Sequence, residues 1–144
     1  MPALDFAFLA DAAEANPGRK FYVLGGGIDA IGAPSFPVVH PNMSLVLRLL
    51  VSSTEVDMDH RLEIRLIDAD GGELARVDGN FNARGRPDPG REIALPLVMN
   101  LVNTRFQAAG DYSVEILVDG EHAKSLPLRL HKVAPQGPQA GPPG

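Results

Sequence analysis

Between residues 44 and 81, three consecutive segments alternate apolar with polar side chains. Because the side chains of a strand point to opposite faces with a period of two, each segment predicts a strand with one buried face. Short polar turns join the segments, so we expect an antiparallel meander around which the rest of the chain is arranged. The expected buried faces consist of Leu45, Leu47, Leu49 and Val51 in the first segment, Leu62, Ile64 and Leu66 in the second, and Ala75, Val77 and Phe81 in the third.

A hairpin is expected before the meander. Residues 4–10 predict its first strand, and Asn16-Pro17-Gly18 predicts a turn into a second strand at residues 20–24. The run Ala12-Ala13-Glu14-Ala15 would also fit a helical extension. We favour the strand, because a turn sequence follows directly.

Glycines and prolines shape the connection from this hairpin to the meander. Gly25, Gly26 and Gly27 predict a bulge in the second strand, or a close approach of neighbouring backbone. A phosphate cradle is disfavoured, because such a loop needs a helix N-terminus behind it or the later lysine of a P-loop. Prolines space out residues 31–41, which we expect to cross between sheets and to expose the apolar side chains Phe36, Val38 and Val39.

Further strands follow the meander. Residues 82–91 predict an exposed loop, and residues 93–97 predict a strand with Pro96 at a sheet edge. Residues 100–109 fit either a helical turn or an irregular crossover, so no element is assigned there. The final hairpin joins residues 112–118 to residues 126–130 through Asp119-Gly120. Its last strand is expected at an edge, with Pro127 outward and these charged side chains discouraging aggregation: Lys124, Arg129 and His131.

These elements together predict an all-β fold. About eight short strands separated by turns, with no convincing helix, are typical of an antiparallel β-sandwich of the immunoglobulin-like or Greek-key type. We expect one sandwich domain over residues 1–133. Residues 134–144 contain only Ala, Pro, Gln and Gly. This composition buries too little apolar area to offset the entropy of ordering, so it predicts a disordered tail.

The composition of the chain limits the classes of partner and site that we expect. The 144 residues include 13 Lys and Arg against 18 Asp and Glu, a net charge of −5 without a basic block. Nucleic acid and anionic membranes are therefore not expected as partners. There is no cysteine, which excludes disulfides and thiolate metal sites. No secretory signal or membrane-spanning run is evident, so we expect a cytoplasmic location. No cofactor is expected.

Several short motifs resemble a family of bacterial proteins of unknown function, each built as one small β-sandwich. The resemblance implies this fold and a cytoplasmic, bacterial setting, and it carries no catalytic residue. It rests on Leu9-Ala10-Asp11, Gly18-Arg19-Lys20, Leu24-Gly25-Gly26-Gly27, Ile28-Asp29-Ala30-Ile31, Phe36-Pro37, Leu66-Ile67-Asp68-Ala69-Asp70-Gly71, Gly110-Asp111-Tyr112 and Leu117-Val118-Asp119-Gly120.

The best candidate for a metal site is the acidic loop that contains Glu55, Asp57, Asp59 and His60. Hard cations such as calcium prefer several carboxylate oxygens, and an imidazole could join them. The second acidic turn, Asp68-Ala69-Asp70-Gly71-Gly72, is expected at the opposite end of the strand, so the two cannot share an ion. It is interpreted as a plain hairpin turn.

Alternating strand directions bring the acidic loop to the same end as two other segments. The residues gathered there would be Asp57, Asp59, His60, Arg84, Arg86, Asp88, Asp119 and His122. Arg84 and Arg86 would repel a cation and can pair with the carboxylates. This mixed-charge surface therefore fits protein recognition better than metal binding, and a solvated loop cluster without a ligand is the plainer interpretation.

Catalytic side chains show no convergent pattern. His40, His60, His122 and His131 lack the spacing of a metal site and are expected to be exposed. No serine lies in a Gly-x-Ser-x-Gly elbow. Tyr112, after Gly110-Asp111 at the start of a strand, resembles the corner tyrosine of Greek-key sandwiches, although simple core packing is an equal alternative.

We therefore expect a non-enzymatic binding or accessory module that acts through protein–protein contacts. Two alternatives stay open: a metal-binding protein or enzyme that uses the loop from Glu55 to His60, and a structural subunit that forms a homo-oligomer. The residues expected to contact a protein partner are Phe36, Val38, Arg84, Arg86, Asp119 and His122.

Overall fold

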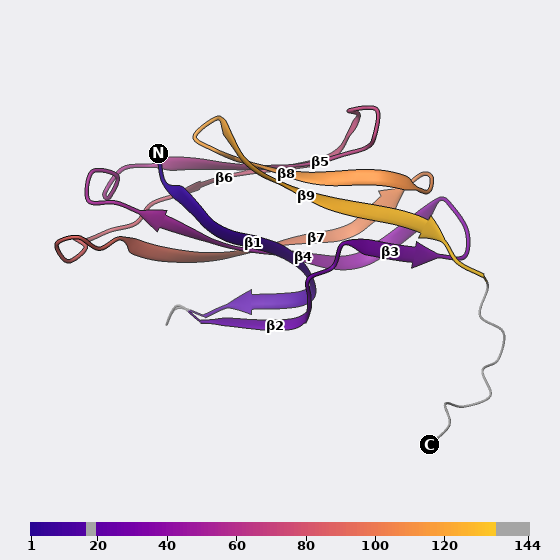
Figure 1. Cartoon of the computed structure of the whole chain (residues 1–144), viewed down its shortest axis with the longest axis horizontal. Coiled ribbons are helices and arrows are strands. Elements are labelled where there is room, and N and C mark those ends of the chain that lie inside the picture. The colour runs from indigo at the N-terminus through magenta and orange to yellow at the C-terminus, as the bar shows by residue number, and fades with distance from the viewer. Residues whose placement is uncertain (17–19, 135–144) are drawn as a thin grey trace, which may run out of the picture.

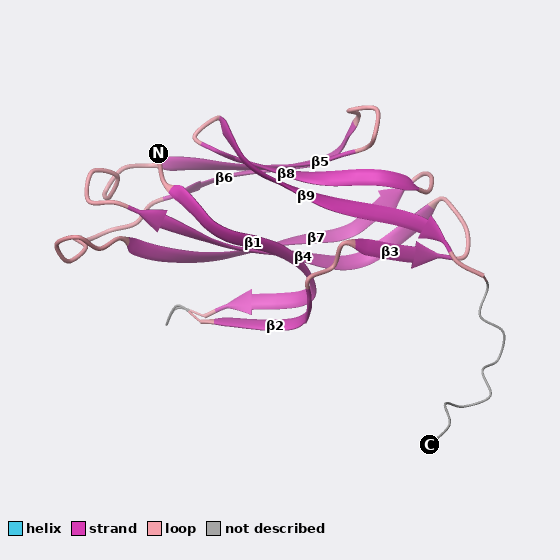
Figure 2. Ribbon diagram, viewed as in Figure 1, coloured by secondary structure: helices cyan, strands magenta, loops and turns pink. Residues whose placement is uncertain are grey.

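The computed structural model, which describes residues 1–16 and 20–134, consists of two β-sheets packed face to face (Figures 1 and 2). The described part of the chain contains no helix, and hence none long and apolar enough to cross a membrane. Its strands are β1 (Ala3–Ala15), β2 (Phe21–Gly26), β3 (Ala30–Ala33), β4 (Val38–Val51), β5 (His60–Ile67), β6 (Glu73–Phe81), β7 (Ile93–Phe106), β8 (Gly110–Val118) and β9 (Glu121–Lys132).

The strand order confirms an all-β, two-sheet fold. The first sheet has the order β2-β1-β4-β7, and the second has the order β3-β9-β8-β5-β6. Neighbouring strands are antiparallel except for β3 and β9, which are parallel. Nine strands are described rather than about eight, because β3 is an additional short strand. The expected tail beyond Ala134, and Pro17 and Gly18 of the expected first turn, lie outside the described residues.

The expected meander of residues 44–81 is wrong as a single sheet. β4 belongs to the first sheet, whereas β5 and β6 belong to the second, so residues 52–59 cross between the layers. Alternation identifies the face that a strand buries, but it does not identify the sheet to which the strand belongs. Strands of two sheets that share one core show the same alternation. The hairpin of β5 and β6 is confirmed.

The predicted apolar faces of β4, β5 and β8 form the core between the sheets. Leu45, Leu47 and Leu49 are fully buried, and they pack in one cluster with side chains of the second sheet. From that sheet come Leu62, Ile64, Leu66, Val114, Ile116 and Val118, among others.

Tyr112 has the structural role that its position suggested. Its hydroxyl donates a hydrogen bond to the Ala108 carbonyl oxygen at 2.7 Å, and its ring packs edge-on against Phe106 with centroids 5.0 Å apart. The side chain therefore ties the connection before β8 to the core. The hairpin turn at Asp119-Gly120 is also confirmed, and both residues have positive φ angles of 49° and 81°. Such angles are those of the two-residue turn that matches strand twist.

The interval 100–109 is largely strand, because β7 continues to Phe106. Two apolar residues in succession, Leu101 and Val102, hid the alternation: Leu101 is buried while Val102 is 61% exposed. β7 is an edge strand, as Pro96 predicted.

The first hairpin is confirmed, but part of it leaves the sheet. The second half of β1 turns back and runs with β2 as a two-stranded ribbon on the side of the first sheet away from the second sheet (Figure 1). We call residues 11–16 and 20–26 the arm. The helical alternative for residues 12–15 is thus wrong, because these residues pair with β2.

The arm explains why β4 is buried on both faces. Ser44 and Val46 alternate with the core-facing leucines of β4, yet both are fully buried. The arm lies on the side of the first sheet away from the core (Figure 1), and the Ser44 hydroxyl donates a hydrogen bond to the Asn100 side-chain oxygen at 2.6 Å.

The glycine stretch ends β2 instead of continuing it. Gly25 and Gly27 have φ angles of 62° and 87°, and the chain then enters β3 of the second sheet. The predicted close approach is present at Gly25, where an added Cβ would lie 2.1 Å from an Asp11 carboxylate oxygen.

The linker of residues 31–41 is shorter than expected, because its ends belong to β3 and β4. Its predicted crossing between sheets is confirmed. Phe36 and Val38 are partly buried against the core, so the expectation that they are exposed is wrong, whereas Val39 is 52% exposed. The prolines gave no sign that the crossing segment also caps the core.

β9 is an edge strand over part of its length only. β3 pairs with residues 129–132, so the expected edge is covered there and stays open over residues 121–128. A strand as short as β3, with Gly32 in its middle, carries too weak a pattern to be predicted.

Candidate functional site

The three segments predicted to share one end of the sandwich do meet. The Asp57 amide donates a hydrogen bond to the Ala83 carbonyl oxygen at 2.9 Å, which joins the loop 52–59 to the loop 82–92. The Asn82 side chain reinforces this join through Asp59 at 3.1 Å. The β8–β9 turn is linked to the same loop through His60.

His60 is buried, with 6% of its surface exposed, so the expectation that it is exposed is wrong. Its Nδ1 lies 2.8 Å from an Asp119 carboxylate oxygen, and its Nε2 lies 2.7 Å from the Glu55 carbonyl oxygen. The ring also stacks on Phe81, with centroids 5.3 Å apart. Both partners are acceptors, so the two ring nitrogens can donate to them at the same time only when the imidazole is protonated.

The electrostatics of this end agree with a charged His60. Burial lowers the pKa of His60, but the hydrogen bonds to Glu55 and Asp119 outweigh it and raise the pKa above its ordinary value. Burial raises the pKa of Asp119. The hydrogen bonds from the Arg61 amide and from His60 outweigh burial and bring this pKa below its usual range. His60, Asp119 and the Glu55 carbonyl group form a clamp. It joins the loop 52–59, the start of β5 and the β8–β9 turn.

Glu55 is similarly occupied. Its carboxylate accepts hydrogen bonds from the Ser52 amide at 2.9 Å and the Ser52 hydroxyl at 2.8 Å, and the Met1 ammonium lies 2.5 Å away. Burial raises the pKa of Glu55, but these contacts prevail and lower it to about 2. The described residues contain no group of three His, Asp or Glu side chains that could hold a metal ion.

The other predicted contact residues at this end are separated from the clamp. Arg84 and Arg86 are exposed in the loop 82–92 and form no ion pair with any described residue. His122 instead lies over β8, where its Nε2 is 2.8 Å from a Glu115 oxygen and 2.9 Å from the Ser125 hydroxyl.

The Ser125, His122 and Glu115 cluster does not have the geometry of a catalytic triad. In a triad the serine and the carboxylate use opposite ring nitrogens, so that a proton can pass through the ring. Here both use the same nitrogen of His122. The Ser125 hydroxyl also donates directly to Glu115. The cluster is therefore a cross-strand hydrogen-bond network.

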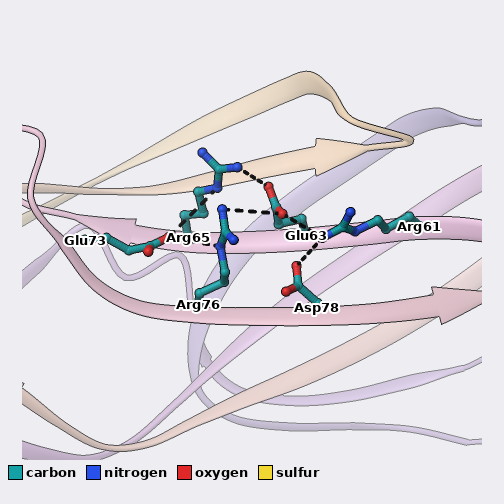
Figure 3. A network of polar contacts seen from close by, with 6 residues as sticks. All are labelled: Arg61, Glu63, Arg65, Glu73, Arg76 and Asp78. Carbon is teal, nitrogen blue, oxygen red and sulfur yellow. Dashed lines mark hydrogen bonds and ion pairs between the residues drawn. The ribbon is translucent and has the colours of Figure 1, made fainter.

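Neighbouring charges on the outer side of β5 and β6 pair with one another (Figure 3). Glu63, only 8% exposed at its side chain, lies 3.2 Å from Arg61, 2.6 Å from Arg65 and 3.6 Å from Arg76. Three cations around one nearly buried carboxylate are further balanced by Glu73 and Asp78. This face is closed by ion pairs and offers no unpaired charge to a ligand.

An exposed apolar surface, not foreseen from the sequence, lies on the arm. Leu24 is 72% exposed and Tyr22 is 55% exposed, and Val23 beside them is 36% exposed. They border an open hollow of about 600 Å³. We call this region the arm surface; its lining residues are Ala12, Ala13, Glu14, Phe21, Tyr22, Val23 and Leu24.

The opposite side of the arm is anchored. The Phe21 ring packs edge-on against Phe6, with centroids 5.8 Å apart, and Phe6 stacks on Phe8 at 6.1 Å. The Arg48 guanidinium lies 5.3 Å above the Phe6 ring and pairs with Asp5 at 2.5 Å. Because this aromatic cluster fixes the arm against the first sheet, Tyr22 and Leu24 are held facing solvent.

β2 also has an open backbone edge. It pairs with β1 alone, and its six residues include no charge and no proline. Proteins usually protect open edges with charged side chains, prolines or irregular backbone. Four other open edges of the described chain carry such features: Asp5 in β1, Glu73, Arg76 and Asp78 in β6, Pro96, Arg105 and the left-handed Asn103 in β7, and Lys124 and Pro127 in β9. β3, at the edge of the second sheet, is uncharged like β2, but it has only four residues and exposes no large apolar side chain.

The sequence did contain a signal for this surface. The run Phe21-Tyr22-Val23-Leu24 is apolar on both strand faces, which usually indicates a strand covered on both sides. The structure covers one side only. The apolar run was thus predictable, but its exposure was not, because exposure depends on where the arm folds.

Comparisons with known proteins add a family but no activity. The family of unknown function DUF6941 matches residues 5–131. No curated protein matches the chain. Among solved structures, the chain is similar to the Pseudomonas fluorescens alkylpurine DNA glycosylase AlkC bound to DNA containing an abasic site analog, with 13% identity and a TM-score of 0.43. That match covers 87% of this chain and 30% of the glycosylase chain.

Proposed function

Since the chain belongs to the DUF6941 family, for which no function is known, we propose from its geometry that it is a non-enzymatic module that binds a protein partner on the arm surface. The expected class of function is that of the sequence analysis, whereas the location is different. The loop residues named there lie in a closed clamp or in an exposed loop, and the arm surface replaces them as the binding region.

A single observation carries the proposal. β2 presents an open, uncharged backbone edge together with Tyr22 and Leu24, which are 55% and 72% exposed. An extended segment of a partner can add to such an edge by main-chain hydrogen bonds, while pockets beside it receive alternate side chains. The open hollow of about 600 Å³ next to β2 provides room for such side chains.

The strand order supports an immunoglobulin-like assignment, which we include in the proposal. In an immunoglobulin sandwich, strands A, B and E are neighbours in one sheet, and strands C′, C, F and G are neighbours in the other. The orders β1-β4-β7 and β6-β5-β8-β9 correspond to these. Tyr112 near the start of β8 matches the corner tyrosine of strand F.

This assignment favours recognition by analogy, since such sandwiches commonly serve as recognition modules. We also propose a cytoplasmic, bacterial setting, as the resemblance of the sequence motifs implies.

Site-specific photo-crosslinking in the native cell tests the binding function. A photoreactive phenylalanine analogue replaces Tyr22 on the arm or, as the matched control, Val102, which is 61% exposed on β7. We expect a protein adduct at position 22 that is absent at position 102 and is lost when Leu24→Lys is added. Identical adduct patterns at the two positions, or no adduct at position 22, would overturn the proposal.

A further inference from the structure

We propose that the partner on the arm surface is a second copy of this chain, with the two β2 strands paired antiparallel about a two-fold axis. This inference rests on the proposed function, because it takes the arm surface as the binding region. It adds the identity of the partner and the register of the contact.

β2 is complementary to itself in shape. An axis through Val23 places Tyr22 opposite Leu24 of the second copy, and Leu24 opposite Tyr22 of the second copy. Side chains that are directly opposite across an antiparallel pair lie on one face and contact each other, and pairs of aromatic and aliphatic residues are favourable there. The regular part of the pairing runs from Tyr22 to Leu24, because Gly25 is left-handed, with a φ angle of 62°, and the Asp11 carboxylate occupies the side-chain position beside it.

β2 is also complementary to itself in charge. The register of the arm aligns Glu14 with Tyr22 and Ala12 with Leu24. In the paired arms, one row of side chains crosses the four strands from Glu14 to Tyr22, and then to Leu24 and Ala12 of the second copy. No two charges of the same sign are neighbours in this row. A protein of net charge −5 associates with itself most readily at such an uncharged place.

The open edges of β6 and β7 do not offer this match, and β3 has only four residues and no exposed large apolar side chain. Pairing two β6 edges would bring Arg76 of one copy close to Arg76 of the other, with Glu73 and Asp78 nearby. β7 lacks an amide proton at Pro96 and bends at Asn103, whose φ angle is 51°. Like charges directly opposite are destabilising, and irregular backbone prevents a continuous ladder.

Such a dimer is closed. Each copy uses its open β2 edge, so the same patch meets itself and no apolar edge stays free for a third copy. The two arms would then form a four-stranded sheet. A two-stranded ribbon is only marginally stable by itself, whereas additional strands stabilise it, so pairing compensates for the distance of the arm from the core.

The oligomeric state of the full chain tests this inference. Sedimentation equilibrium from about 1 to about 200 μM should show a monomer–dimer equilibrium. Tyr22→Glu and Leu24→Lys should each raise the dissociation constant by about tenfold or more, because each places a charge against an apolar side chain at both symmetric contacts. Val102→Lys, an equally exposed change on β7, should leave the constant unchanged.

A charge exchange tests the register. In the double variant Tyr22→Glu/Leu24→Lys, the antiparallel register sets each introduced carboxylate opposite an introduced ammonium, so dimerisation should recover relative to both single variants. A 1:1 mixture of the two single variants should form a heterodimer. Unchanged thermal unfolding of the Leu24→Lys monomer would show that the fold is intact.

The outcomes separate the two proposals. A wild-type chain that is monomeric over the whole range, or a dimer that ignores the arm substitutions, would overturn the second-copy inference. If photo-crosslinking at position 22 nevertheless yields an adduct with a different protein, the binding function stands without self-association. If it yields none, both proposals fail.

Discussion

At the scale of single residues, buried polar atoms with complete hydrogen bonding tie loops to the core. The Tyr112 hydroxyl, in β8, binds the Ala108 carbonyl oxygen in the preceding loop at 2.7 Å. His60, at the start of β5, binds the Asp119 carboxylate in the β8–β9 turn at 2.8 Å. Removing one partner of such a bond leaves the other unsatisfied, and that loss costs more than the bond itself contributes.

Replacement of Tyr112 by phenylalanine tests the corner bond. Tyr112→Phe keeps the ring packed on Phe106 but leaves the Ala108 carbonyl oxygen without its donor. We expect the free energy of unfolding to fall by about 1 kcal/mol. Urea denaturation measures this, and an unchanged midpoint would show that water replaces the hydroxyl at no cost.

The His60 clamp predicts a dependence of stability on pH. The pKa of His60 is raised in the folded chain, so its stabilisation is complete below the unfolded pKa and is lost as pH rises through the folded pKa. The free energy of unfolding should therefore decline from about pH 6.5 upwards. Urea midpoints measured across this range should decline less in His60→Gln, and parallel curves for the two proteins would contradict the clamp.

At the scale of elements, the arm is the part that deviates most from a simple sandwich. Its return path depends on glycine, because Gly25 adopts φ of 62° and leaves no room for a Cβ beside Asp11. Left-handed backbone costs a non-glycine residue about 1 kcal/mol or more. The position of the arm thus follows from one backbone position and from the aromatic contact of Phe21 with Phe6.

Substitution at Gly25 should loosen the arm selectively. Gly25→Ala is expected to destabilise by about 1–2 kcal/mol and to increase amide hydrogen exchange in residues 11–16 and 20–26 more than elsewhere. Gly79→Ala is the control, since an added Cβ meets no atom within 4 Å there. Equal exchange in the two variants would mean that Gly25 does not govern the arm.

At the scale of the whole molecule, one core between two sheets provides the stability, and the arm provides exposed apolar surface. Leu47 is fully buried, whereas Leu24 is 72% exposed. The same side chain therefore serves packing at one position and, in our proposal, recognition at the other. An exposed apolar patch with a polar surround is typical of an interaction site.

Two identical truncations separate these roles. Leu47→Ala should lower the free energy of unfolding by about 2–5 kcal/mol, because it opens a cavity in the core. Leu24→Ala should change the unfolding of the monomer by less than about 0.5 kcal/mol. Both are measured by urea denaturation at low protein concentration, and a large loss for Leu24→Ala would indicate that the arm packs inward.

The sequence by itself determined the local features: the inward faces of β4, β5 and β8, the Asp119-Gly120 turn and the corner position of Tyr112. Each depends on side-chain alternation or on backbone angles within a few residues. Only the tertiary structure decided that β4 and β5 lie in different sheets, that His60 is buried and that Leu24 is exposed. These properties depend on which distant segments meet, and an apolar side chain has the same sequence pattern whether a neighbouring layer covers it or leaves it to solvent.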